Sequence, residues 1–178
     1  MPQNAGMSEI VRYTYVDSPL GKLLITACNA GIRSLSFPRE QGPRRADEEW
    51  EEVGPVEIPG VEEQLNAYFA GELTEFDLPL NPIGTEFQQS VWKALQTIPY
   101  GETISYGEQA RRIGNPNASR AVGGANGANP IAIVIPCHRV IGSNKSLTGF
   151  TGGLDKKQFL LAHEQAVKPP EEDQLRLI

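Results

Sequence analysis

The chain has 178 residues, enough for one ordinary domain or two small ones, and a formal net charge of −6. No run approaches the roughly 18 consecutive apolar residues of a membrane-spanning helix. The first residues have no basic segment before an apolar one, which argues against a secretory signal. Two cysteines, Cys28 and Cys137, make no disulfide framework, and with two histidines they argue against a structural zinc site. We therefore expect a cytoplasmic protein with no membrane contact and no metal.

Charge is distributed unevenly along the chain. Residues 1–84 carry 6 Lys and Arg against 14 Asp and Glu, a balance of −8, whereas residues 85–178 carry 10 against 8, a balance of +2. Between residues 47 and 77 there are eleven acids and no Lys or Arg. An acidic segment repels phosphate, so a nucleic acid would be contacted by the second half. Solubility alone would explain the same asymmetry.

The first half of the chain predicts a small α/β domain over residues 1–80. Three runs with alternating or β-branched apolar residues, joined by turn residues, predict the strands of an antiparallel meander. These runs are residues 11–16, 22–28 and 32–37. Apolar spacing predicts a helix over 61–69, ended by Gly71. The stretch 79–84, rich in Pro and Gly, predicts a domain boundary.

The second half predicts a mainly helical domain over residues 81–168, followed by a flexible tail over 169–178. Thr85 and Gln88 form a capping-box pattern at the start of its first helix. A last helix is expected over 155–163.

Two short helices in this half have the pattern of a helix-turn-helix. Ser105 and Asn117 are expected to cap them, and the second helix runs to about Asn126. This second helix is almost bare of long side chains, although each Gly costs about 1 kcal/mol relative to Ala in a helix. Its small residues are Ala118, Ser119, Ala121, Gly123, Gly124, Ala125, Gly127 and Ala128. The pattern suits either close packing in the core or close approach to the narrow minor groove of DNA.

Cys137 follows an apolar, β-branched run that predicts a buried strand carrying the cysteine. A single cysteine is often only a small buried hydrophobic residue. Here Pro136 precedes it and His138 and Arg139 follow it, so a proton acceptor and a positive charge stand beside the sulfur. This pattern indicates a nucleophilic thiolate, and we expect a thiol pKa below the ordinary value of about 8.5.

The segment Pro-Cys-His-Arg-Val over residues 136–140 resembles the signature of the O6-alkylguanine-DNA alkyltransferases, also known as methylated-DNA–protein-cysteine methyltransferases. The resemblance runs through ordered motifs from residue 85 to residue 164, and residues 18–21 are more loosely similar to the bacterial members. The motifs are Ser105-Tyr106-Gly107, Gly114-Asn115-Pro116, residues 119–125, Asn129-Pro130, residues 136–141, Gly152-Gly153-Leu154 and residues 160–164.

The resemblance implies an α/β fold in which a ribonuclease H-like domain, a meander plus a helix, precedes a winged-helix-like domain. It implies direct-reversal DNA repair: an irreversible, single-turnover transfer of the alkyl group from O6-alkylguanine, and from O4-alkylthymine, in duplex DNA to Cys137. The partner is double-stranded DNA that contains the lesion. We expect a monomer, and no cofactor, because the DNA itself donates the alkyl group.

By the same resemblance, the second helix of the helix-turn-helix lies in the minor groove, with Ser119, Ala121 and Gly123 on its DNA face. Arg120 fills the gap left by an extruded base, and Tyr106 crowds the adjacent phosphate. Extrusion is required, because a stacked guanine cannot bring its O6 atom to a buried sulfur.

His138 is expected to act as general base through a bound water, with Glu164 orienting its imidazole. On a strand His138 would point away from Cys137, a difficulty that the water resolves. Asn129 is implied to join the helix-turn-helix to the cysteine segment by hydrogen bonds. His163 is the rival base, although a structural role fits it better.

The Tyr106 hydroxyl and backbone N–H groups near Ser143 are expected to stabilise the departing guanine. Val140, Ser143, Phe150 and Thr151 are expected to line the substrate pocket. Phe150 and Thr151 differ from the tyrosine and the small residue that many relatives carry there, and this difference bears on the preferred alkyl size.

Three other functions fit parts of the pattern. The first is an alkyl-lesion-binding protein without transfer activity, but such relatives lack the cysteine. The second is a helix-turn-helix regulator, which would need base-reading side chains on residues 117–128. The third is a hydrolase that uses Cys137 and His163.

Arg139 is expected to be a structural cation paired with a carboxylate.

Overall fold

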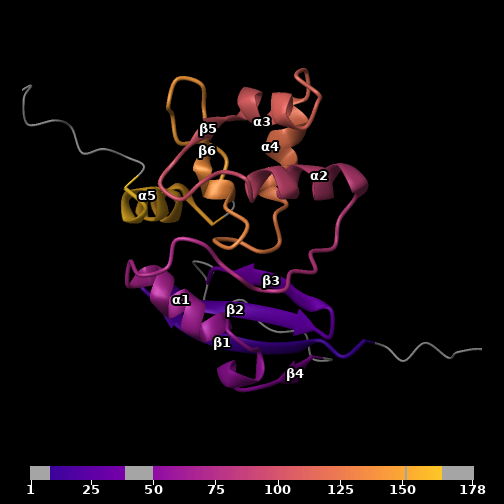
Figure 1. Ribbon diagram of the computed structural model, residues 1–178, viewed down its shortest axis with the longest axis vertical. Helices are drawn as coiled ribbons and strands as arrows, with labels where there is room; N and C mark the ends of the chain where they lie inside the picture. The colour runs from indigo at the N-terminus through magenta and orange to yellow at the C-terminus, as the bar shows by residue number, and fades with distance from the viewer. Residues whose placement is uncertain (1–8, 39–49, 151, 166–178) are drawn as a thin grey trace, which may run out of the picture. The chain divides into compact units, whose positions relative to one another are not determined.

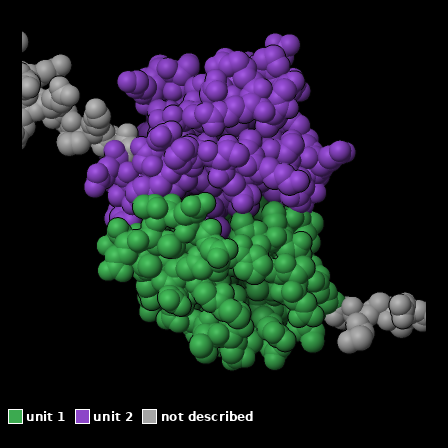
Figure 2. Space-filling view, in the orientation of Figure 1, with its two compact units in different colours: residues 1–83, 130–132 green, residues 84–129, 133–178 purple. Residues whose placement is uncertain are grey.

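The computed structural model describes residues 9–38, 50–150 and 152–165 (Figure 1). The chain divides into two compact units (Figure 2). Unit 1 comprises residues 1–83 and 130–132, and unit 2 comprises residues 84–129 and 133–178. No helix in the described ranges is long and apolar enough to cross a membrane.

The described part of unit 1 contains a four-stranded sheet in the order β3-β2-β1-β4. β1 (Arg12–Ser18), β2 (Gly21–Cys28) and β3 (Gly31–Ser36) form the antiparallel meander that the sequence predicts. The short β4 (Glu51–Glu52) pairs in parallel with β1, and no pattern in the sequence predicts it. A 3-10 turn, η1 (Pro55–Glu57), follows.

The predicted helix of unit 1 is present as α1 (Val61–Phe69), which lies against the sheet (Figure 1). It buries Val61, Leu65 and Tyr68, so the spacing that predicted the helix also defines its packed face. The outer edge of β3 is also covered. Ile32 N–H donates to Pro79 O at 2.8 Å, and Leu35 N–H donates to Pro130 O at 2.9 Å.

Unit 2 is mainly helical. Its elements in chain order are α2 (Glu86–Leu95), β5 (Ile104–Ser105), α3 (Tyr106–Arg112), α4 (Ser119–Gly127), η2 (Cys137–Arg139), β6 (Val140–Ile141) and α5 (Leu154–His163). β5 and β6 form a two-stranded parallel ladder. The sheet in unit 1 and the helices in unit 2 confirm the predicted α/β class.

Side-chain caps begin two of these helices where the sequence predicted. Thr85 Oγ1 accepts from Gln88 N–H at 3.2 Å, and Gln88 Oε1 accepts from Thr85 N–H at 2.9 Å, which completes the capping box of α2. Ser105 Oγ accepts from Glu108 N–H at 3.1 Å and caps α3.

The predicted cap of α4 was wrong by one residue. Ala118, not Asn117, is the N-cap, and it provides no side-chain hydrogen bond. The reason is local, since Ala118 N–H donates to Asn115 O at 3.0 Å and extends the preceding turn. The backbone N–H groups that begin α4 therefore have no side-chain cap from that residue.

The predicted strand before Cys137 was also wrong. Residues 132–134 form a turn, residue 135 is a bend, and Cys137 opens the 3-10 turn η2. Ile133 has φ of +70°, which interrupts an extended backbone, and Pro136 has no N–H to offer a neighbouring strand. The run is buried as expected, but an apolar pattern alone does not separate a buried strand from buried turns.

Candidate active site

Cys137 lies at the N-terminal end of η2 and is buried, with 9% of its surface exposed. Asn129 Nδ2 donates to Ile135 O at 2.7 Å, and the Asn129 side chain also hydrogen-bonds the Cys137 thiol. Asn129 thus joins the end of the helix-turn-helix to the cysteine segment. Cys137 lies in a segment of turns, and the hydrogen bond from Asn129 to Ile135 O helps to hold that segment in place.

Burial raises the pKa of the Cys137 thiol, although the Asn129 hydrogen bond and the charge of Lys157 oppose the rise. The expectation of a lowered thiol pKa is therefore wrong for this state of the protein. Desolvation of a thiolate outweighs the local donors and the positive charge. The sulfur is a protonated thiol at neutral pH, so nucleophilic attack requires a base.

His138 and Glu164 form a fully buried pair, with 2.8 Å between His138 Nε2 and Glu164 Oε1. Burial lowers the pKa of His138, which is thus neutral. Burial would raise the pKa of Glu164, but hydrogen bonds from His138 and Arg139 outweigh it and hold that pKa well below its usual range. A carboxylate only accepts, so Nε2 carries the imidazole proton and Nδ1 is the free base. Among the described residues, Nδ1 is buried and makes no hydrogen bond.

Arg139 holds the other side of the Glu164 carboxylate. Its Nε donates to Oε2 at 2.8 Å and its Nη2 donates to Oε1 at 2.9 Å, while Nη1 donates to Ile98 O at 2.7 Å. This bidentate geometry fixes the carboxylate plane and therefore the direction in which it accepts from His138. The predicted pairing of Arg139 with a carboxylate is confirmed, and the carboxylate is Glu164.

Tyr106 begins α3 and packs against α4. The Tyr106 hydroxyl donates to Thr148 O at 2.9 Å. Burial raises the pKa of Tyr106, and the nearby Cys137 raises it further. A Cβ on Gly123 would lie 3.8 Å from the Tyr106 ring. An added Cβ would thus only make ordinary van der Waals contact with the ring, while the Tyr106 hydroxyl faces the loop over residues 142–150.

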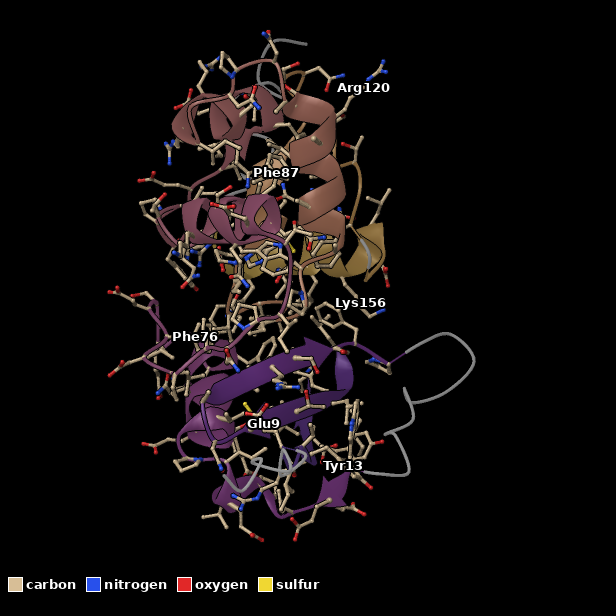
Figure 3. The ribbon with its side chains drawn as sticks, turned by 90° about the vertical axis from the view of Figure 1, so that its right-hand side faces the viewer. Glu9, Tyr13, Phe76, Phe87, Arg120 and Lys156 are labelled. Atoms are coloured by element: carbon tan, nitrogen blue, oxygen red, sulfur yellow. The ribbon has the colours of Figure 1, made fainter. Side chains whose placement is uncertain are left out.

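The proposed DNA face of α4 is exposed. Arg120 and Ala121 are exposed, Ser119 and Gly123 are half-buried, and Arg120 extends away from the end of the helix (Figure 3). A Cβ on Gly124 would meet no atom within 4 Å, so internal packing does not require a glycine at that position. Packing in the core is therefore not a sufficient reason for the glycine at position 124.

The expected pocket residues have different surroundings. Val140 is fully buried, Phe150 is half-buried and Ser143 is exposed. Thr151 lies outside the described residues.

His163, the rival base, stacks its ring parallel to Phe159, with centroids 6.2 Å apart. Among the predicted site residues, hydrogen bonds join Asn129 to the Cys137 segment and His138 to Glu164, and Tyr106 lies near Cys137.

Two family models match the chain. The model described as 6-O-methylguanine DNA methyltransferase, ribonuclease-like domain, matches residues 11–82, and the one described as 6-O-methylguanine DNA methyltransferase, DNA binding domain, matches residues 86–166. The methylated-DNA–protein-cysteine methyltransferase of Mycolicibacterium paratuberculosis is 55% identical over 161 residues, which cover 90% of this chain and 96% of that protein. The chain belongs to the 6-O-methylguanine DNA methyltransferase family.

Solved structures support the same assignment. The crystal structure of the Mycobacterium tuberculosis O6-methylguanine methyltransferase has a TM-score of 0.81 and 51% identity, and covers 93% of this chain and 99% of that one. The Mycobacterium tuberculosis protein named OGT was also crystallised in complex with DNA; that structure has a TM-score of 0.79 and 50% identity, and covers 87% and 93%. The predicted family and fold class are confirmed.

The sequence motifs do not include one further residue of the site, a lysine on α5. Lys157 on α5 is fully buried, and its Nζ donates to Val140 O at 2.5 Å and to Thr148 O at 2.9 Å. Burial lowers the pKa of Lys157, and the nearby Cys137 partly offsets this decrease. Its Nζ also lies 5.9 Å from the centroid of the Tyr106 ring.

A signal for Lys157 was present in the sequence. Leu160, Leu161 and Glu164 follow it by three, four and seven residues, which places the lysine on the buried face of the last helix. Lysine is almost never fully buried without partners, so a lysine on such a face indicates a specific polar role. In this structure its ammonium group ties the segment after Cys137 to the loop that Tyr106 contacts.

Proposed function

We propose that this protein repairs alkylated duplex DNA by direct reversal, moving the alkyl group from O6 of guanine to the sulfur of Cys137. A single observation carries the proposal. In a chain of this family, a buried thiol lies next to a neutral histidine whose carboxylate partner is itself fixed by an arginine. The crystallised complex of the Mycobacterium tuberculosis relative with DNA supports DNA as the partner.

The reaction begins with removal of the thiol proton. His138 Nδ1 accepts that proton, with a water molecule relaying it from Cys137, and the Glu164 carboxylate stabilises the imidazolium that forms. The sulfur then attacks the alkyl carbon in line, so that the S–C bond forms as the C–O6 bond breaks. The leaving guanine takes up one proton, which balances the proton that the thiol gave to His138, so the imidazole returns to its neutral form and the normal base is restored in DNA.

Binding of the base changes the contacts of Tyr106. Its hydroxyl donates to Thr148 O in this structure, so it has to exchange that acceptor for the base in order to assist the leaving guanine. Backbone N–H groups near Ser143 are the other proposed donors. Among the described residues, Val140, Ser143 and Phe150 are the ones proposed to line the pocket for the alkyl group and the base.

DNA is bound through the minor groove by α4, with Ser119, Ala121 and Gly123 against the groove. Arg120 takes the place of the nucleotide that rotates out, and the target base enters the site beside Cys137. Small side chains give little sequence readout, which suits a repair protein that meets its lesion in any sequence context. O4-alkylthymine is proposed as a second substrate, because extrusion can present its alkyl group in the same way.

The protein reacts once per molecule. A thioether has no easy route back to a thiol, and Cys28 belongs to unit 1 and accepts a hydrogen bond from Asn81 Nδ2 at 3.4 Å. We propose that the first domain, residues 1–80, supports residues 81–168, which carry DNA binding and transfer, and that the protein acts as a monomer.

Intact-mass spectrometry tests the proposal. The protein is incubated with excess duplex that contains O6-methylguanine, and the expected product is protein heavier by one methyl group, located on the peptide with Cys137. Product should plateau at one methyl group per protein. Binding without a mass change would indicate a lesion-binding protein, and product formation beyond the plateau would indicate a turnover enzyme; either result rejects the proposal.

A further inference from the structure

Three charged side chains form an exposed ion cluster on one face of α3. Arg111 donates to Glu108 Oε2 through Nε at 3.1 Å and through Nη2 at 2.8 Å. Arg112 donates through Nε to Glu108 Oε1 at 3.2 Å. Residues three and four positions apart share a helix face, so one carboxylate serves two guanidinium groups. The cluster therefore has a net charge of +1.

Glu108 is ionised in this cluster. The hydrogen bonds from Arg111 and then Arg112 lower its pKa. From residue 106 to residue 127, the span of the helix-turn-helix, the sequence has three arginines and a single acid, Glu108. The one negative charge of this motif is therefore placed where it pairs with two of its three positive charges.

The cluster lies next to the first turn of α4. A Cβ on Gly107 would lie 3.9 Å from Arg111 Nη1 and 4.0 Å from Ser119 Oγ, so both atoms border the space that the glycine leaves open. Arg111 thus reaches the same surface as Ser119, which is placed on the DNA face under the proposed function. The exposure of the Arg111 side chain is 62% and that of Arg112 is 38%, so both are accessible to a partner.

We propose that Arg111 and Arg112 bind the phosphodiester backbone of duplex DNA, and that Glu108 competes with phosphate for both of them. The proposal rests on the proposed DNA-binding function and extends its surface from α4 to α3. A guanidinium group binds carboxylate and phosphate with the same forked geometry. Because exposed ion pairs are weak, a phosphate can displace Glu108 at little cost.

This arrangement would set how tightly undamaged DNA is held. Backbone contacts are independent of sequence and of damage, so each one retains the protein on normal DNA as firmly as on a lesion. A built-in carboxylate lowers the contribution of two such contacts without removing them. The expected consequence is weaker non-specific binding than three uncompensated arginines would give.

The test measures binding of a fluorescent, unmodified duplex by anisotropy over a range of salt concentrations. Glu108→Gln keeps the size and hydrogen-bonding capacity of the side chain and removes its charge, and it should tighten binding severalfold at low salt. The double variant Arg111→Gln/Arg112→Gln should weaken binding. It should also reduce the slope of log K against log salt by about 0.9 for each phosphate that is no longer neutralised.

The ion pair of Asp17 and Lys22 in unit 1 provides matched controls. It is also exposed, with 3.9 Å between Lys22 Nζ and Asp17 Oδ1. Asp17→Asn removes the same charge as Glu108→Gln, and Lys22→Gln removes one positive charge; both should leave the affinity for DNA unchanged. Thermal melting of each variant checks its folding.

Two results would overturn the proposal. One is a gain for Glu108→Gln no larger than that for Asp17→Asn, and the other is an unchanged salt slope in the double arginine variant. If the wild-type chain neither binds the duplex nor becomes methylated by the lesion, the proposed function fails instead, and the two failures are thereby distinguished.

Discussion

Gln109 on α3 and Asn126 on α4 exchange two amide hydrogen bonds inside the helix-turn-helix. Gln109 Nε2 donates to Asn126 Oδ1 at 3.0 Å, and Asn126 Nδ2 donates to Gln109 Oε1 at 2.7 Å, with both residues buried. Apolar packing alone would let the two helices slide, whereas a reciprocal pair of bonds is satisfied in one register. The pair therefore fixes the position of Arg120 and the rest of α4 relative to α3.

This pair predicts a non-additive effect on stability. Gln109→Leu leaves the Asn126 amide buried without its partner and should cost about 1–3 kcal/mol of unfolding free energy. The double variant Gln109→Leu/Asn126→Leu should recover part of that loss, because no polar group is left unpaired. Urea unfolding of the two single variants and the double variant measures the coupling, and additive losses would contradict it.

The identity of the base can be decided by comparing two histidines. His138 is buried against Glu164, whereas His163 stacks on Phe159. General-base assistance contributes about 10²–10⁴-fold, so His138→Ala should slow methyl transfer by a factor in that range. His163→Ala, measured at the same pH on folded protein, should have a small effect. If His163→Ala were the slower variant, the catalytic geometry would have to be rebuilt around α5.

Stability should fall on the acid side of neutrality. Burial lowers the folded-state pKa of His138, and the hydrogen bonds of Glu164 lower its pKa despite burial. Below their ordinary pKa values of 6.5 and 4.5, both groups bind fewer protons in the folded state than in the unfolded state, so protonation favours unfolding. We expect the unfolding free energy to decline as the pH falls below 6.5 and more steeply below 4.5.

Denaturant unfolding from pH 8 to pH 4 measures this decline. In His138→Gln the first part of the decline should be absent, because the titrating imidazole is gone, while the second part should remain. A wild-type stability that does not change between pH 6.5 and pH 5 would contradict the assignment of a buried, neutral His138.

Gly124 separates the two explanations for the small residues of α4. A Cβ at this position meets nothing within 4 Å, and Ala is about 1 kcal/mol better than Gly in a helix. Gly124→Ala should therefore stabilise the protein while weakening duplex binding if α4 enters the minor groove. Melting temperature and anisotropy on the same variant make the test. Stabilisation with unchanged DNA affinity would show that Gly124 does not face the groove.

Lys157 should affect both the structure of the site and the thiol. Lys157→Met keeps much of the stem but loses the donor to Val140 O and Thr148 O, at a cost of about 1–3 kcal/mol for each acceptor left unsatisfied. It also removes a charge that lowers the pKa of Cys137, so that pKa should rise further. The pH dependence of thiol alkylation by iodoacetamide measures the rise. An unchanged thiol titration in folded Lys157→Met would show that the ammonium charge does not reach the sulfur.

Several parts of this protein depend on local chemistry and could therefore be predicted from the sequence. Turn residues predict the meander of unit 1, and apolar spacing predicts α1. Side-chain acceptors within a few residues predict the caps that begin α2 and α3. The signature around Cys137 likewise indicated the family, because a nucleophile and its neighbours are contiguous in the chain. In each case the deciding interactions span only a short stretch of sequence.

Other features depend on residues that are distant in the chain, and these became known only from the folded structure. The backbone before Cys137 forms turns because Ile133 is held at a positive φ, which an apolar pattern does not report. The thiol pKa is raised because the fold removes water from Cys137, and desolvation depends on all the surrounding elements. Lys157 enters the site because α5 packs its buried face beside Val140, so its carbonyl partners are defined only once the chain is folded.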